Sequence, residues 1–170
     1  ILDAHLDIWD ALDILHIDAH PDLYDSLLGN KLSHASPFAR IMETGRARRL
    51  VQVGIRTLNK HQREQAEKFG VEIYQMKDLT KLNSLSFSKP VYCSIDIDAL
   101  DPAYAPGVSH FEPGGLSTRQ LIDCLNGFKG RLIGADIVEY NPKRDFHNFT
   151  AMVAAKLLKE VIARIYRDNS

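Results

Sequence analysis

The segment "LHIDAHPDLYD", Leu15–Asp25, places three aspartates and a histidine directly after an apolar, strand-like run. In an extended chain residues i, i+2 and i+4 share a face, so Asp18, His20 and Asp22 are expected to point together past the end of the strand. Pro21 favours extended backbone before it. Carboxylates this close together repel one another unless a positive group lies between them. The segment therefore predicts a bound cation.

A second segment, "SIDIDALDP", Ser94–Pro102, repeats the pattern, with Asp96 and Asp98 on one side at the end of another apolar run. Hard carboxylates with one imidazole and no thiolate favour Mn²⁺, with Mg²⁺, Fe²⁺, Zn²⁺ or Ni²⁺ as alternatives. Alone, each pattern is also typical of an ordinary loop or of a turn with a solvated histidine. An EF-hand is excluded because the loop has Gly107 instead of Glu at its twelfth position.

Short apolar runs rich in β-branched residues alternate with helical patterns along the chain. The predicted strands are 14–17, 50–55, 71–74, 91–97 and 132–138, and the predicted helices are 37–43, 60–69, 118–128 and 150–166. This alternation predicts a single α/β domain over residues 1–170, with helices on both faces of a mainly parallel sheet of about five strands. Apolar residues also recur at helical spacing from Leu2 to Leu12, so a helix is expected there.

Composition narrows the class of function. The 45% hydrophobic content of the 170 residues is enough for one core. The formal net charge of -1, and a longest basic run of only "RARR", Arg46–Arg49, expected at a solvated helix end, argue against nucleic-acid or membrane-surface binding. No membrane span or secretory signal is recognised. Cys93 and Cys124 are expected to be buried free thiols in a reducing compartment.

Five motifs together carry a resemblance to a known family: "DAHPD", "GNKLSHASPFARI", "VGIR", "SIDIDALDPAYAPGVSHFEPGGLS" and "GADIVEYNP". In this order they resemble the manganese ureohydrolases, which include arginases and agmatinases, over most of the chain from Asp13 onward. The wording is most similar to plant-type arginases and related cyanobacterial guanidino-compound hydrolases. The resemblance implies a three-layer αβα, arginase-like fold with the strand order last, fourth, first, second, third. It also implies that the family's N-terminal strands are missing from this sequence.

The resemblance further implies a ligand set for two Mn²⁺ ions. Asp18 and Asp96 would bridge the ions. His20 and Asp98 would complete the protein ligands of one ion, and Asp22 would bind the other. In the family a further histidine for that second ion comes from an upstream Gly-Gly-Asp-His segment, which this sequence does not contain.

The same resemblance implies catalytic and substrate-binding roles. A hydroxide shared by the two ions would attack the guanidinium carbon. Asp98 lies where the family relays a proton, and His34 matches its proton-shuttling, substrate-contacting histidine. Glu139 matches the carboxylate that pairs with the guanidinium.

Three further residues have two interpretations each. Asn59 matches a contact to the distal end of the substrate, and it equally suits a helix N-cap before Lys60. His110 and Glu112 either border the pocket or stiffen its loop.

The leading hypothesis is a binuclear manganese amidinohydrolase that cleaves arginine, agmatine or a smaller guanidine to urea and an amine, with Ni²⁺ or Zn²⁺ as alternative metals. A truncated, inactive metal-binding subunit or fragment is the main alternative, and a single-zinc deacetylase-like hydrolase is a remoter one. The expected partner is a small guanidino substrate, without nucleic acid or membrane. An exposed apolar sheet edge predicts a homo-oligomer. The location would be mitochondrial if the chain is plant-type and cytoplasmic otherwise.

Overall fold

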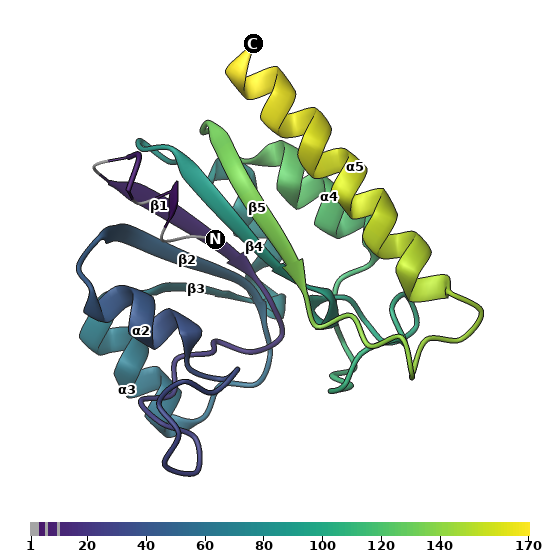
Figure 1. The fold of residues 1–170 in the computed structure, drawn as a ribbon, viewed down its shortest axis with the longest axis horizontal. Coiled ribbons are helices and arrows are strands. Elements are labelled where there is room, and N and C mark those ends of the chain that lie inside the picture. The colour runs from purple at the N-terminus through teal and green to yellow at the C-terminus, as the bar shows by residue number, and fades with distance from the viewer. Residues whose placement is uncertain (1–3, 6, 10) are drawn as a thin grey trace.

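A computed structural model describes residues 4–5, 7–9 and 11–170. It contains one sheet between helices (Figure 1). The strands are β1 Leu12–Ile17, β2 Ala47–Ile55, β3 Glu72–Gln75, β4 Val91–Asp96 and β5 Leu132–Val138. The helices are α2 Pro37–Glu43, α3 Lys60–Phe69, α4 Thr118–Gly127 and α5 Phe149–Asn169, with 3₁₀ segments η1 Met76–Ser84 and η2 Ile97–Ala99.

The sheet has five strands in the order β3-β2-β1-β4-β5, and all four strand pairs are parallel. This is the predicted order. The chain moves outward in opposite directions from β1 and β4, and such a switch opens a crevice at the carboxyl ends of the two strands. Ile17 of β1 pairs with Ile95 of β4. Asp18 and Asp96, the next residues of each strand segment, therefore leave the sheet side by side.

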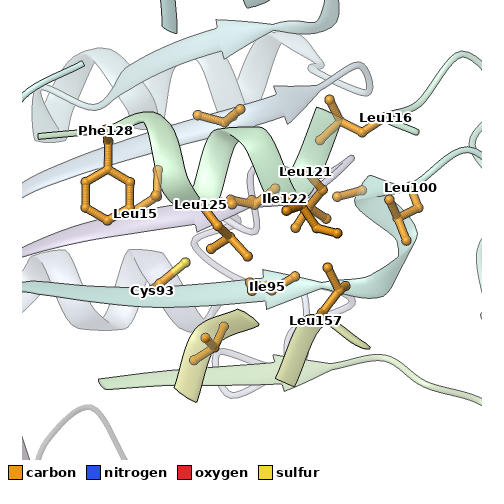
Figure 2. Close-up of a cluster of buried hydrophobic side chains, with 14 of the residues drawn as sticks. Leu15, Cys93, Ile95, Leu100, Leu116, Leu121, Ile122, Leu125, Phe128 and Leu157 are labelled. Carbon is orange, nitrogen blue, oxygen red and sulfur yellow. The ribbon is translucent and has the colours of Figure 1, made fainter. Parts of the chain in front are cut away.

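Helices cover both faces of the sheet (Figure 1). The larger core lies between the sheet and helices α4 and α5, where Figure 2 shows Leu15 near Phe128 and Ile95 near Leu157. On the other face a smaller cluster joins β1 and β2 to α2 and α3. The central strands β1 and β4 are buried along their whole length, as expected for parallel strands covered on both sides.

The prediction of a helix from Leu2 to Leu12 is wrong for most of the residues that the structure describes there. Leu12 is fully buried, is the first residue of β1 and pairs with Ala47 across the ladder. Residues 4–5 are helical and residues 7–9 form a turn and a bend, whereas Leu2 and Leu6 lie outside the described residues. Pairing with β2 makes the chain extended at Leu12, whatever the helical spacing of the apolar residues before it.

The predicted helix end at the basic run is also wrong. Arg48 and Arg49 belong to β2, which begins three residues earlier than expected. Arg49 reaches Glu72 on the neighbouring strand β3, with Nη2 2.7 Å from Oε2. A cross-strand ion pair thus accommodates the basic residues at the start of this strand.

Both cysteines are free, as predicted, and Cys93 is fully buried. Burial raises the pKa of the Cys124 thiol to about 12. Cys124 is half-buried, so the predicted burial holds fully only for Cys93, and a raised thiol pKa disfavours the nucleophilic thiolate form. Among the described residues no helix has the length and apolar character needed to cross a membrane.

Candidate metal centre

The two acidic segments meet at the carboxyl ends of β1 and β4. Asp18 directly follows β1 and is 1% exposed, and Asp96 ends β4 and is 4% exposed. Oδ1 of Asp96 accepts the backbone N–H of Asp98 at 2.8 Å, which begins the 3₁₀ turn η2 and places a second carboxylate above the strand end. Oδ1 of Asp98 accepts the N–H of Ala19 at 3.3 Å. This bond joins the two segments.

One potential ligand group consists of Asp18, His20 and Asp98, whose ligand atoms all lie within 4.8 Å of one another. Nδ1 of His20 is 3.5 Å from Oδ1 of Asp18 and 3.1 Å from Oδ2 of Asp98. One imidazole and two carboxylates from neighbouring strands thus converge on one point, in agreement with the sequence prediction for these three residues.

A second group consists of His16, Asp18 and Asp22, within the same 4.8 Å limit. An extended backbone was predicted through Asp22, but this prediction is wrong, because the φ of Asp22 is 50°. This left-handed conformation costs a non-glycine residue about 1–3 kcal/mol. The turn directs the Asp22 carboxylate back toward Asp18. In a fully extended chain this side chain would instead point past the end of the strand.

Asp96 lies beside these groups without belonging to either. It lines a cavity of about 230 Å³ at the strand ends. The other residues that line this cavity are His20, Asp22, Tyr24, Leu27, His34, Ala35, Gln62, Asp98, His110 and Glu139. Six of the eight predicted site residues therefore line this cavity. Of the other two, Asp18 lines the adjoining cavity of about 280 Å³ and Asn59 lines an outer one.

The electrostatics of the centre show an excess of negative charge. Burial, followed by the charges of Asp18 and Asp98, raises the pKa of Asp96 to about 11. Burial and then Asp18 raise the pKa of Asp22 to about 8. Burial lowers the pKa of His20, but the hydrogen bonds that its ring donates to the carboxylates of Asp18 and Asp98, together with their charges, outweigh burial and raise this pKa to about 11. Without a cation, protons must therefore neutralise part of the cluster.

The residues present fit a divalent cation. Oδ2 of Asp18 is buried and accepts no hydrogen bond from the described residues, although Nε2 of His16 lies 2.8 Å away. A buried carboxylate oxygen that forms no regular hydrogen bond still has lone pairs for a cation, and leaving them unused is costly. Carboxylates with one or two imidazoles are ligands suited to Mn²⁺ and to other divalent ions of intermediate hardness.

His34 and Glu139 face the same space from outside the two ligand groups. Both line the cavities beside the carboxylates. Glu139 directly follows β5 and has φ 63°, another left-handed non-glycine conformation. The charge of Glu139 also contributes to the raised pKa of Asp22, so the two carboxylates lie near one another. The ring of His34 stacks on His110 with centroids 5.9 Å apart.

Asn59 is the N-cap of α3. Its Oδ1 accepts the N–H of Gln62 at 2.9 Å, and Gln62 returns the bond in a capping box. Its Nδ2 donates to the hydroxyl of Tyr24. Asn59 also lines an outer cavity of about 440 Å³, together with His20, Tyr24 and Glu112. The N-cap interpretation is confirmed, whereas the contact to the distal end of a substrate stays a prediction.

The loop with His110 and Glu112 borders the pocket. Oε1 of Glu112 lies 3.5 Å from Nε2 of His20, and the His110 ring meets His20 edge-on at 6.0 Å. Arg56 holds this loop, since its guanidinium donates to the carbonyls of Glu112 and Asp98. This role of Arg56 was not predicted from the sequence, and neither was the place of the buried His16 and Gln52 below the site. For His16 the strand period is a usable signal, because this residue is two positions before Asp18.

The family model described as "Arginase family" matches residues 1–163. The chain belongs to the arginase family. It is 57% identical over 162 residues to "Arginase 1, mitochondrial" of Arabidopsis thaliana, covering 91% of this chain and 47% of that protein. It thus spans about half the length of the curated relatives it matches.

Solved structures agree with this arginase-like fold. The "Arginase from Medicago truncatula" superposes with a TM-score of 0.89 at 53% identity, covering 95% of this chain and 53% of that one. A triple mutant of the T. brucei arginase-like protein, bound with Mn²⁺, gives 0.87 at 31% identity, covering 97% and 57%. The predicted family and three-layer fold are confirmed.

Proposed function

We propose that this chain provides the metal-binding and catalytic part of a manganese amidinohydrolase, which cleaves a guanidino compound to urea and an amine. Arginine is the first candidate substrate, and agmatine or a smaller guanidine follows. The observation that carries the proposal is the pair of ligand groups that share Asp18. Membership in the arginase family and the similarity to plant arginases support the reaction class.

The chain's own residues would hold the ions as follows. His20 and Asp98 serve one position, Asp22 serves the other, and Asp18 serves both. Asp96, buried in the same cavity, is the proposed second shared ligand. When bound, Mn²⁺ supplies Lewis acidity that lowers the pKa of water enough for attack on the guanidinium carbon near neutral pH.

Glu139 and His34 are the proposed substrate-contacting residues. Glu139 offers a carboxylate from the end of β5, and a carboxylate pairs with a planar guanidinium through two parallel hydrogen bonds. His34 lines the same cavity, and an imidazole suits the transfer of a proton to the departing amine. Asp98, in contact with His20, is the proposed acceptor of the proton that the attacking water loses, and it would pass this proton on toward the departing amine.

The distal end of the substrate would lie in the outer cavity of about 440 Å³. The polar groups of Asn59 are engaged by Gln62 and Tyr24. Asn59 would therefore act there mainly by holding the Tyr24 hydroxyl in place.

We also propose a cellular location and an oligomeric state for the protein. A mitochondrial location follows from the similarity to "Arginase 1, mitochondrial", and a cytoplasmic one is the alternative. A homo-oligomer is proposed because α5 exposes large apolar side chains, among them Met152, Ile162 and Tyr166.

Urea release tests the reaction directly. The Mn²⁺-loaded chain is incubated with arginine, agmatine and guanidine, alongside Asp96→Asn and a control, Asp123→Asn, on the surface of α4. We expect urea from at least one compound, loss of urea and of bound Mn²⁺ in Asp96→Asn, and neither loss in the control. No urea together with unchanged Mn²⁺ content in Asp96→Asn contradicts the proposal. No urea with Mn²⁺ lost favours the metal-binding subunit without activity.

A further inference from the structure

A buried imidazole lies directly below the metal centre, and the proposed function does not use it. His16 belongs to β1 and is 1% exposed. It is two residues before Asp18, and its Nε2 lies 2.8 Å from Oδ2 of Asp18. The ring packs on Phe38 of α2, with centroids 3.8 Å apart at 32°. Distance alone makes His16 a third ligand candidate beside Asp18 and Asp22.

The neighbouring strand decides which ring nitrogen carries the proton. Gln52 of β2 is the ladder partner of His16 and is fully buried. Its Nε2 lies 2.6 Å from the carbonyl oxygen of Pro21 and 3.0 Å from Nδ1 of His16. A carbonyl only accepts hydrogen bonds, so the amide nitrogen, not the amide oxygen, must face Pro21. The second N–H of the same amide then points at Nδ1 of His16.

The hydrogen-bond network therefore fixes the tautomer. Because Nδ1 of His16 accepts from Gln52, the neutral ring carries its proton on Nε2. A nitrogen that carries a proton has no lone pair for a metal ion. The Nε2–H group faces Oδ2 of Asp18 at short distance without forming a regular hydrogen bond. The oxygen is thus held by a positive dipole and keeps its lone pairs for a cation.

We propose that Gln52 and His16 form a positioning unit for the metal centre, and that His16 is not itself a metal ligand. Gln52 reaches the Asp18 carboxylate through His16, and it reaches Asp22 through the carbonyl of the preceding residue, Pro21. One amide thus orients the two carboxylates that belong to the same ligand group. The inference rests on the proposed function in so far as those carboxylates bind Mn²⁺.

Mn²⁺ binding by the purified chain tests this unit. Calorimetric titration compares the unsubstituted protein with His16→Phe, Gln52→Met and the double variant. Substitution of residues that orient metal ligands typically weakens metal affinity by about 10- to 100-fold. We expect that loss in each single variant, an unchanged number of sites, and no further loss in the double variant, because the two residues act as one unit. Gln65→Met, at another buried glutamine, is the matched control and should leave affinity unchanged.

Two spectroscopic readouts separate positioning from ligation and from misfolding. With ¹⁵N-labelled histidine, pulsed EPR of bound Mn²⁺ should count the same number of coupled histidine nitrogens in His16→Phe as in the unsubstituted protein. In the unsubstituted, metal-free protein, ¹⁵N NMR should show His16 protonated at Nε2 only. Loss of a coupled nitrogen, or a proton on Nδ1, overturns the proposal, as does unchanged affinity in both single variants. If the unsubstituted chain binds no Mn²⁺, the proposed function fails, while the NMR tautomer still tests the Gln52–His16 arrangement.

Discussion

Two acidic residues of the centre, Asp22 and Glu139, have left-handed backbone conformations with φ of 50° and 63°. Such conformations cost about 1–3 kcal/mol each and persist where the surrounding structure determines them. Both residues follow strands at the same edge of the sheet, and both side chains line the same cavities. The unusual backbone thus directs carboxylates into a space that is already rich in negative charge. This arrangement destabilises the fold by itself and suits the binding of a cation.

Glu139→Gln separates substrate binding from metal binding. A hydrogen bond to a charged group contributes about 1.5–3 kcal/mol, so loss of the carboxylate should raise KM for the guanidino substrate about 10- to 100-fold. Bound Mn²⁺ should be unchanged, since Glu139 is in neither ligand group. Urea-release kinetics and metal analysis measure the two quantities, and Glu64→Gln on the surface of α3 is the control. Loss of Mn²⁺ in Glu139→Gln would show that this carboxylate is a ligand instead.

Residue spacing predicted part of this site. The period of an extended strand correctly brings Asp18 and His20 together, and the second motif adds Asp98. The same rule fails at Asp22, because a turn with positive φ depends on contacts such as the Gln52 bond to Pro21, which joins distant parts of the chain. The same spacing rule places His16 on the side of Asp18. From the sequence alone, however, His16 is an ordinary strand residue, because its contact with Gln52 depends on which strands are neighbours.

At the scale of elements, α5 is joined to the end of α4 by one buried side chain. Arg164 is 5% exposed and pairs with Asp168 at 2.6 Å. Its guanidinium donates to three backbone carbonyls, those of Leu125, Phe128 and Gly130. The last carbonyls of a helix have no partner within the helix, and α4 ends without a left-handed cap residue. Arg164 supplies those missing hydrogen bonds from the next helix.

Arg164→Met should therefore lower the free energy of unfolding by about 3–5 kcal/mol, since it leaves buried carbonyls and Asp168 without their partner. Arg167→Met is the matched control. Arg167 is on the same helix and lies 3.7 Å from the same Asp168, but its side chain is 60% exposed. The control should cost no more than about 1 kcal/mol. Urea denaturation of both variants gives the comparison, and equal losses would refute a special role for the buried guanidinium.

Local signals predicted most element boundaries, and their failures are non-local. Gly70, with φ 65°, ends α3 as a left-handed C-cap glycine, and the Ser117 side chain caps the N-terminus of α4. The strand order was implied by the family resemblance and not by periodicity, which carries no information on which strands are neighbours. Leu12 was misplaced because its pairing with Ala47 across the sheet outweighs its helical spacing. The 3₁₀ segment η1 was not predicted, since short 3₁₀ turns have weak sequence preferences.

At the scale of the whole molecule, a chain with a formal net charge of -1 concentrates its acidic groups at one edge of the sheet. Asp22 and Asp96 have raised pKa values, mainly through burial, and His20 has a raised pKa from its contacts with carboxylates. For all three groups the folded state holds a proton that the unfolded state releases at lower pH. Each such proton makes the metal-free fold less stable by up to about 1.4 kcal/mol for every unit by which pH rises.

The metal-free chain should accordingly unfold at a lower temperature as pH rises from about 5 to about 8, through the interval between the ordinary pKa of an aspartate and the raised pKa of Asp22, about 8. Mn²⁺ replaces these protons, so its stabilising effect should be larger at pH 8 than at pH 6. Thermal unfolding with EDTA or Mn²⁺ at the two pH values measures both effects. Asp22→Asn should flatten the metal-free pH dependence, whereas Asp123→Asn, on the surface of α4, should leave it unchanged. If the metal-free protein is as stable at pH 8 as at pH 6, the carboxylates are not crowded enough to require a cation, and the physical basis for the metal centre is lost.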